Sequence, residues 1–201
     1  FIDMVDSMEN GPQKVVDAAR DLGIPGLDGD KFGIPRRTTD LQPILGVPLG
    51  TAQVSPINLA NAYATIAAGG QRAAVHVIEK VETRAGEVDY QFKSSTKRTV
   101  DEDIAADVSY ALQQVVEQGS GSAARALGRT VAGKTGTATN DDGDVSSSWF
   151  VGYTPQLSTA VMYARGKGRG ALDGWLPEYF GGSFPARTWA AVMTPMVADL
   201  P

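Results

Sequence analysis

The last third of the chain alternates short β-like runs with turn signals, and this order constrains the fold more than any other feature. The runs cover residues 130–139, 148–153 and 158–165. Connections this short join antiparallel neighbours, because a parallel pair needs a crossover of about a dozen or more residues. The sequence therefore predicts an antiparallel sheet in this part of the chain.

Helical patterns come mainly before these strands, and one follows them. Apolar spacing together with start and stop residues predicts helices over residues 1–9, 12–22, 56–68, 101–118 and 185–198. In the helix at 101–118, the predicted buried face consists of Ile104, Val108, Leu112 and Val115. Segments at 75–81 and 87–92, with a turn at 84–86, are typical of a β-hairpin. We therefore predict an α/β chain of the α+β type, with helices packed on an antiparallel sheet.

Composition excludes several classes of function. The chain has 201 residues, enough for one domain or a large part of one. Its net charge of -5 argues against a nucleic-acid partner. The absence of cysteine excludes a disulfide scaffold, a thiolate metal site and a cysteine nucleophile. We expect neither a metal nor a cofactor. Because the first residues already have a helical pattern, we expect the chain to start in mid-fold, with any membrane anchor upstream.

One strand segment carries the residues that most clearly suggest chemistry, Lys134-Thr135-Gly136-Thr137. Glycine weakens a strand interior and often marks the close approach of a ligand. In an ideal pleat Lys134 and Gly136 face one side while Thr135 and Thr137 face the other, and twist can bring them to a common edge. Such an edge suits an extended peptide, whose carboxylate and reacting carbonyl need cationic, hydroxyl and N–H partners. From the tripeptide alone, a strand end with a solvated lysine is the favoured interpretation.

The neighbouring segments give this motif its context. In order along the chain they are residues 49–56, 62–65, 69–70, 115–121, 132–137, 148–155 and 181–182, followed by Pro185 and Trp189. Together they resemble the class A (bifunctional) penicillin-binding proteins over nearly the whole chain. The Lys-Thr-Gly run is similar to the third signature of the Ser-x-x-Lys, Ser-x-Asn and Lys-Thr-Gly enzymes. The resemblance implies a β-lactamase/transpeptidase-like fold, of which residues 1–201 would be the incomplete C-terminal part.

The resemblance also implies a reaction and roles for four residues. A serine would attack the D-Ala-D-Ala end of a peptidoglycan stem peptide, and β-lactams would acylate the same serine. Lys134 and Thr137 would be the catalytic residues, the first through its charge and the second through its backbone N–H in the oxyanion hole. The hydroxyls of Thr135 and Thr137 would bind the substrate carboxylate, and Gly136 would leave room for the ligand. An upstream glycosyltransferase domain and a place on the extracytoplasmic face of the bacterial membrane would follow.

The nucleophile motif is missing from the place where the resemblance requires it. The one Ser-x-x-Lys match runs from Ser94 to Lys97, and we interpret it as a polar loop after the hairpin. No Ser-x-Asn occurs in the chain. We therefore expect the chain to begin after both motifs, to pair with the rest of the transpeptidase domain, and not to be acylated alone.

Three other functions stand beside the transpeptidase. A class A β-lactamase is disfavoured, because no glutamate is followed four residues later by asparagine. A D-alanyl-D-alanine carboxypeptidase shares the same strand motif and stays open. So does a non-catalytic penicillin-binding sensor module, which the strand would serve equally well.

The remaining polar and aromatic candidates have plainer interpretations. His76 has no nucleophile signature near it, so we expect a structural role, either at the surface or half-buried. The acidic run 141–144 has the wrong spacing for a calcium loop and is typical of a solvated turn. The acidic run 101–103 suits a helix N-terminus. Trp175, Tyr179 and Phe180 are candidates either for lining a groove near the site or for ordinary packing.

Overall fold

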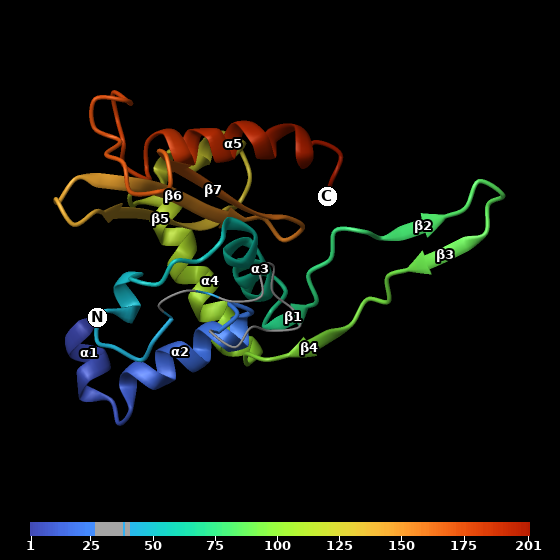
Figure 1. The fold of residues 1–201 in the computed structure, drawn as a ribbon, viewed down its shortest axis with the longest axis horizontal. Helices are drawn as coiled ribbons and strands as arrows, with labels where there is room; N and C mark the ends of the chain where they lie inside the picture. Colours follow the sequence, from blue (N-terminus) through green and yellow to red (C-terminus); the bar gives the residue numbers. More distant parts are fainter. Residues whose placement is uncertain (27–37, 39–40) are drawn as a thin grey trace.

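The computed structural model describes residues 1–26, 38 and 41–201 (Figure 1). The helices are α1 (Ile2–Ser7), α2 (Gly11–Leu22), α3 (Pro56–Ala67), α4 (Glu102–Glu117) and α5 (Phe184–Met196), with short 3-10 turns η1 (Val47–Leu49) and η2 (Ser122–Leu127). The strands are β1 (Gln71–Ala73), β2 (Lys80–Glu82), β3 (Val88–Gln91), β4 (Thr96–Arg98), β5 (Ala132–Thr139), β6 (Val145–Tyr153) and β7 (Ser158–Ala164). Each predicted helix and each predicted strand of the last third is confirmed, with shifted ends.

The main sheet has the order β5-β6-β7, with antiparallel neighbours. Helix α5 covers one face of this sheet, while α3 and α4 lie on the other side (Figure 1). This arrangement confirms the predicted antiparallel sheet with packed helices. It follows from the short turns between the strands, which leave the helices to cover the two apolar faces.

Register fixes which face each residue of β5 occupies. Ala132 pairs with Tyr153, and both pack in the cluster that contains Ile66 of α3. Lys134 and Gly136 follow Ala132 at two-residue steps and so begin on this same face. Thr135 and Thr137 belong to the opposite face, which α5 covers.

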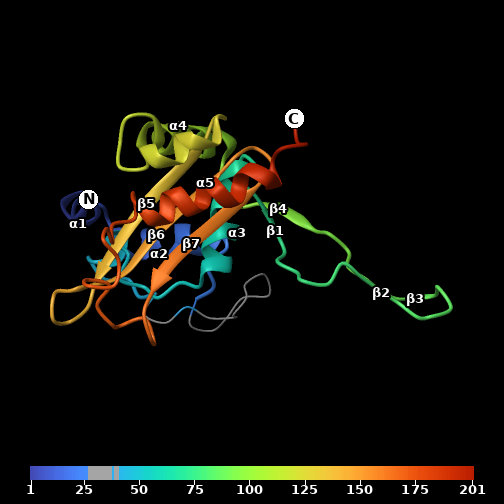
Figure 2. The same ribbon diagram turned by 90° about the horizontal axis from the view of Figure 1, so that it is seen from above.

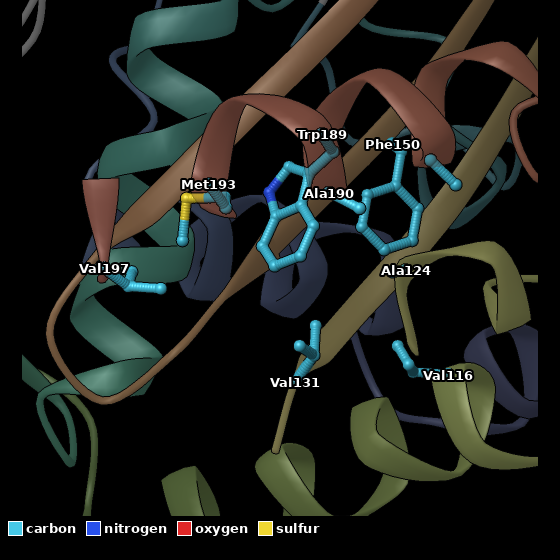
Figure 3. Close-up of a cluster of buried hydrophobic side chains, with 9 residues drawn as sticks. Val116, Ala124, Val131, Phe150, Trp189, Ala190, Met193 and Val197 are labelled. Atoms are coloured by element: carbon cyan, nitrogen blue, oxygen red, sulfur yellow. The ribbon is translucent and has the colours of Figure 1, made fainter. Parts of the chain in front are cut away.

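The largest hydrophobic cluster lies between α5 and the sheet (Figure 3). Trp189 and Phe150 are both fully buried, and their rings meet edge to face at 5.4 Å. The Trp189 Nε1–H donates to the carbonyls of Gly152 at 3.2 Å and Thr159 at 3.1 Å. A buried indole keeps its N–H paired in this way, because an unpaired donor would cost about 1–3 kcal/mol. The cluster thus fixes α5, and the segment before it, over β5 and β6.

The predicted buried face of α4 is wrong in its first half, whereas Leu112 packs partly buried against the cluster that contains Ile66. Ile104 is 54% exposed and Val108 is 38% exposed, whereas Ala105 and Val116 are buried. Successive helical residues turn by about 100°, so the buried face lies one residue further along than the apolar spacing indicated. The polar Ser109 belongs to it, because its hydroxyl accepts a hydrogen bond from the Tyr153 hydroxyl at 2.8 Å. A hydrophobicity pattern does not predict the partial burial of Ser109, because this polar residue is partly buried through its hydrogen bond with Tyr153.

A long arm projects from the body of the molecule (Figures 1 and 2). Strands β2 and β3 form its outer ladder, which confirms the predicted hairpin although residues 75–79 lie outside the strand. Strands β1 and β4 pair at its base. The interpretation of Ser94–Lys97 as a loop is therefore corrected, because Lys97 lies in β4 opposite Arg72. Residues before and after a hairpin pair readily once its ladder sets their register.

Candidate active site

The outer edge of β5 is one of the two edges of this sheet, and it is the edge on which the Lys134 motif lies. Among the residues that the structure describes, β5 ends the order β5-β6-β7 and has no strand on its outer side. The Lys134 Nζ donates to the Thr135 carbonyl at 2.9 Å across this edge. In an antiparallel pair, the N–H and C=O of a residue point the same way, and residues two apart share that direction. The Thr137 N–H therefore faces the open edge as well.

Lys134 reaches this edge from the far face of the sheet. Its backbone pairs with Val151, and its exposed side chain curls round so that Nζ lies 3.5 Å from the Thr135 hydroxyl oxygen. The predicted convergence of neighbouring side chains at a common edge is thus observed for these two residues. A cation placed here can stabilise negative charge on a ligand or on a neighbouring oxygen.

Two hydroxyls on the other face are held by groups from outside the sheet. The Thr135 hydroxyl lies 2.7 Å from the hydroxyl of Ser120, a residue of the turn that joins α4 to η2. The Thr137 hydroxyl accepts a hydrogen bond from the Gly181 N–H at 3.3 Å. Both threonines therefore have defined side-chain directions before any ligand arrives, as a preorganised site requires.

A cleft of about 660 Å³ opens beside these hydroxyls. Its lining residues are Ser120, Thr135, Thr137, Glu178, Phe180, Gly181, Gly182, Ser183 and Arg187. They come from the end of α4, the middle of β5, the segment before α5 and the first turn of α5. On its rim, Arg187 forms an exposed ion pair with Glu178 at 3.3 Å. The cleft thus offers hydroxyl groups, backbone groups and charges of both signs within one volume.

Close packing at Gly136 and Gly181 brings the segment before α5 onto the sheet. A Cβ on Gly181 would lie 2.2 Å from the Trp149 carbonyl oxygen and 2.6 Å from that of Gly136. A Cβ on Gly136 would lie 3.2 Å from the Trp149 Cβ. Gly136 therefore has a packing role against Trp149. Its predicted role in leaving room for a ligand stays a prediction.

The rejected serine motif lies elsewhere in the molecule. Strand β4, with Lys97, lies at the base of the arm beside β1 and away from β5 (Figures 1 and 2). Both Ser94 and Lys97 are exposed. Their position agrees with the prediction that this motif is not the catalytic one.

The other polar candidates lie outside the cleft as well. His76 is on the arm, where its Nε2 lies 2.9 Å from Glu79 and its ring stacks on Phe92 at 3.6 Å. Residues 141–144 form the exposed turn between β5 and β6, organised by the side chain of Asn140, as predicted. The acidic run 101–103 begins α4, also as predicted.

One of the three aromatic candidates does line the cleft. Phe180 is among its lining residues and stays 58% exposed, while the ring of Tyr179 packs beside it at 5.0 Å. Trp175 instead lies under the guanidinium of Arg165 at 4.4 Å. The groove interpretation therefore holds for Phe180.

Sequence reasoning missed Ser120, Glu178 and Arg187 as residues of the cleft. Ser120 follows the end of a predicted helix and precedes a glycine, which is a position where a hydroxyl usually satisfies local backbone groups. Glu178 and Arg187 are nine residues apart on either side of a turn. Neither spacing has a helical or strand period, so no sequence signal joins them to β5.

Comparison of the sequence with known proteins confirms the predicted resemblance to penicillin-binding proteins. A family model described as the penicillin binding protein transpeptidase domain matches residues 7–193. Penicillin-binding protein 1A of Mycolicibacterium smegmatis is 36% identical over 198 residues, which cover 92% of this chain and 24% of that protein. Penicillin-binding protein 1A of Neisseria meningitidis is 34% identical over 171 residues, covering 81% of this chain and 20% of that protein. The chain thus spans 20% to 24% of the length of these curated relatives.

Solved structures agree in three dimensions. The penicillin-binding protein PonA1 of Mycobacterium tuberculosis superimposes with a TM-score of 0.82 at 29% identity, over 100% of this chain and 53% of that one. The structure of PonA1 in complex with penicillin V gives a TM-score of 0.80 at 30% identity, over 98% of this chain and 52% of that one. The fold described above is therefore shared with a protein that binds a β-lactam.

Proposed function

Because this chain belongs to the penicillin-binding protein transpeptidase family, we propose that it supplies the substrate-holding strand of a serine D,D-transpeptidase. In the reaction, a serine Oγ attacks the penultimate D-alanine carbonyl of a stem peptide, an ester forms and the terminal D-alanine leaves. The amine of a second stem peptide then attacks the ester, which forms the cross-link and regenerates the serine. β-Lactams enter the first step and stay bound as the ester.

The observation that carries this proposal is the open edge of β5, where three kinds of group converge. The Thr137 N–H is one donor of the oxyanion hole for the tetrahedral intermediate. The hydroxyls of Thr135 and Thr137 bind the carboxylate of the stem peptide or drug. Lys134 places a positive charge beside them and assists the proton transfers of the serine. Gly136, between the two threonines, lets the ligand lie close to the strand.

The serine nucleophile lies outside residues 1–201. Support comes from the sequence, which has no Ser-x-Asn, and from the fold, which places the one Ser-x-x-Lys match on the arm away from β5. The chain is the C-terminal part of the transpeptidase domain and completes its site with the rest of that domain. Residues 1–201 alone are then not acylated.

The relatives named penicillin-binding protein 1A support a proposal for the wider setting of the protein. The substrate is peptidoglycan, so the domain works on the extracytoplasmic face of the bacterial cell membrane, next to an upstream glycosyltransferase domain. Within the described ranges of this chain, no helix is both long and apolar enough to cross a bilayer.

The test labels the full-length protein with a fluorescent penicillin and maps the label by mass spectrometry. Lys134→Ala is expected to slow acylation by about 10²- to 10⁴-fold, the range for loss of a group that moves protons. Lys97→Ala, a lysine of the rejected motif on the arm, is the matched control and leaves the rate unchanged. An unlabelled wild type would overturn the proposal, and label on Ser94 would move the nucleophile to the arm. Release of D-alanine without cross-linked product would favour the carboxypeptidase.

A further inference from the structure

Ser120 lines the cleft but has no role in the acyl transfer proposed above. It stands in the turn between α4 and η2, and its hydroxyl oxygen is 2.7 Å from the hydroxyl oxygen of Thr135. This is the usual distance of an O–H···O hydrogen bond. Both side chains line the cleft. The hydroxyl that binds the carboxylate therefore has a second hydroxyl as its immediate partner.

The donors and acceptors at Thr135 decide which way its proton points. A hydroxyl has one proton to donate and two lone pairs with which to accept. The Lys134 ammonium has only donors, so at 3.5 Å it occupies one lone pair of the Thr135 oxygen. When Ser120 donates to the second lone pair, the Thr135 proton is left for a ligand. Two donors on one oxygen also polarise it, which strengthens the bond that it donates.

The backbone of Ser120 is held in place from both sides. The N–H of the next residue, Gly121, donates to the Val115 carbonyl at 2.9 Å and closes the end of α4. On the other side, a Cβ on Gly182 would lie 2.2 Å from the Ser120 carbonyl oxygen, so the segment before α5 rests directly on this turn. The hydroxyl of Ser120 is therefore presented to Thr135 by a fixed backbone.

We propose that Ser120 is a positioning residue that turns the Thr135 hydroxyl proton toward the carboxylate of the ligand. Lys134, Thr135 and Ser120 then act as one donor group for an anion. Ser120 acts through Thr135 and not on the reacting carbonyl. This inference rests on the proposed function, and it predicts selectivity for the charged carboxylate over a neutral group in the same place.

The test compares two probes on the full-length protein: a fluorescent penicillin with its free carboxylate, and the methyl ester of the same compound. Ser120→Ala is expected to slow acylation by the free acid about 10-fold, the scale of one hydrogen bond to a charged group. The ester, which is neutral, is expected to change by less than about 2-fold. Ser120→Thr keeps a hydroxyl and restores the rate with the acid. Ser122→Ala, in the adjoining turn η2, is the matched control and affects neither probe.

The outcomes separate this inference from the proposed function. Equal losses of Ser120→Ala on both probes would show a packing role and overturn the inference, as would an unchanged rate with the acid. If the alanine variant does not fold, Ser120→Cys replaces it in the test. The cysteine S–H is similar in size but only a weak donor, so this variant should lose the same selectivity for the acid over the ester. A wild type that neither probe acylates would sink the proposed function, and this inference with it.

Discussion

Replacing Gly181 with alanine tests how closely the segment before α5 must approach β5. The new Cβ would lie 2.2 Å from the Trp149 carbonyl oxygen and 2.6 Å from that of Gly136. Contacts below 3.0 Å essentially never occur for real Cβ atoms, and the obstacles here are backbone atoms that cannot rotate away. The segment must therefore move off the sheet by about 1 Å, the scale at which misplaced groups impair catalysis.

That displacement has two effects that can be measured separately. Overpacking against a fixed backbone typically costs about 1–3 kcal/mol of unfolding free energy. The displacement also breaks the hydrogen bond from the Gly181 N–H to the Thr137 hydroxyl, which is 3.3 Å long in the structure. Because Thr137 contributes to the proposed oxyanion hole, a shift of about 1 Å is expected to slow acylation by about 10²-fold. Gly181→Ala should thus impair activity and stability by comparable free energies, since a 10²-fold loss of rate equals about 2.7 kcal/mol.

Gly170→Ala is a control from the same connection between β7 and α5. There the new Cβ would meet only the side-chain carbons of Arg165, at 3.4–3.5 Å, which is ordinary contact. Its stability should stay within about 0.5 kcal/mol of the wild type. Unfolding in urea and the rate of labelling by a fluorescent penicillin, both on the intact domain, measure the two effects. A Gly181→Ala variant that labels at the wild-type rate would contradict the steric origin of the effect.

Two further variants test the core and its pH dependence. Trp189→Ala should lower the free energy of unfolding by about 3–5 kcal/mol in a urea titration. The control Trp175→Ala, which loses an exposed contact with Arg165, should cost less than about 1 kcal/mol. Equal losses would contradict the burial assigned to Trp189. Burial, and then the charge of Tyr153, raises the pKa of Tyr63 from 10.0 to about 12. Since the folded chain holds this proton more tightly, stability is fully present below pH 10 and falls by about 3 kcal/mol as the pH rises through 12. Tyr63→Phe should remove that part of the loss, and an unchanged pH profile of unfolding would refute it.

The sequence correctly predicted those turns and helix starts that depend only on neighbouring residues. The turn with Gly86, which has a φ of 84°, joined the arm strands where expected. Ser55 begins α3 by accepting a hydrogen bond from the Asn58 N–H, as a Ser-Pro start predicts. The motif on β5 was predicted from its residue types and from the sequence segments around it. The fold places it on an edge strand, where an extended ligand has access.

The predictions that failed were those in which contacts with distant residues outweighed the local hydrophobicity pattern. Ile104 and Val108 are apolar at helical spacing, yet Ala105 is buried in their place. Ser109 contacts the sheet, because the Tyr153 hydroxyl donates a hydrogen bond to it. Lys97 is polar and exposed, yet it lies in β4 because the arm brings Arg72 opposite to it. In both cases a partner distant in sequence decided the outcome.

Local sequence patterns were sufficient to predict the helices, the antiparallel order of the last strands and the strand that carries Lys134 and the two threonines. The surroundings of that strand, in contrast, depend on tertiary packing. This packing brought Ser120 from the end of α4 and Gly181 from the segment before α5 to within hydrogen-bond distance of the two threonine hydroxyls. These contacts arise because Trp189 anchors α5 over the sheet, and a periodic pattern along one element carries no information about which distant backbone packs onto it.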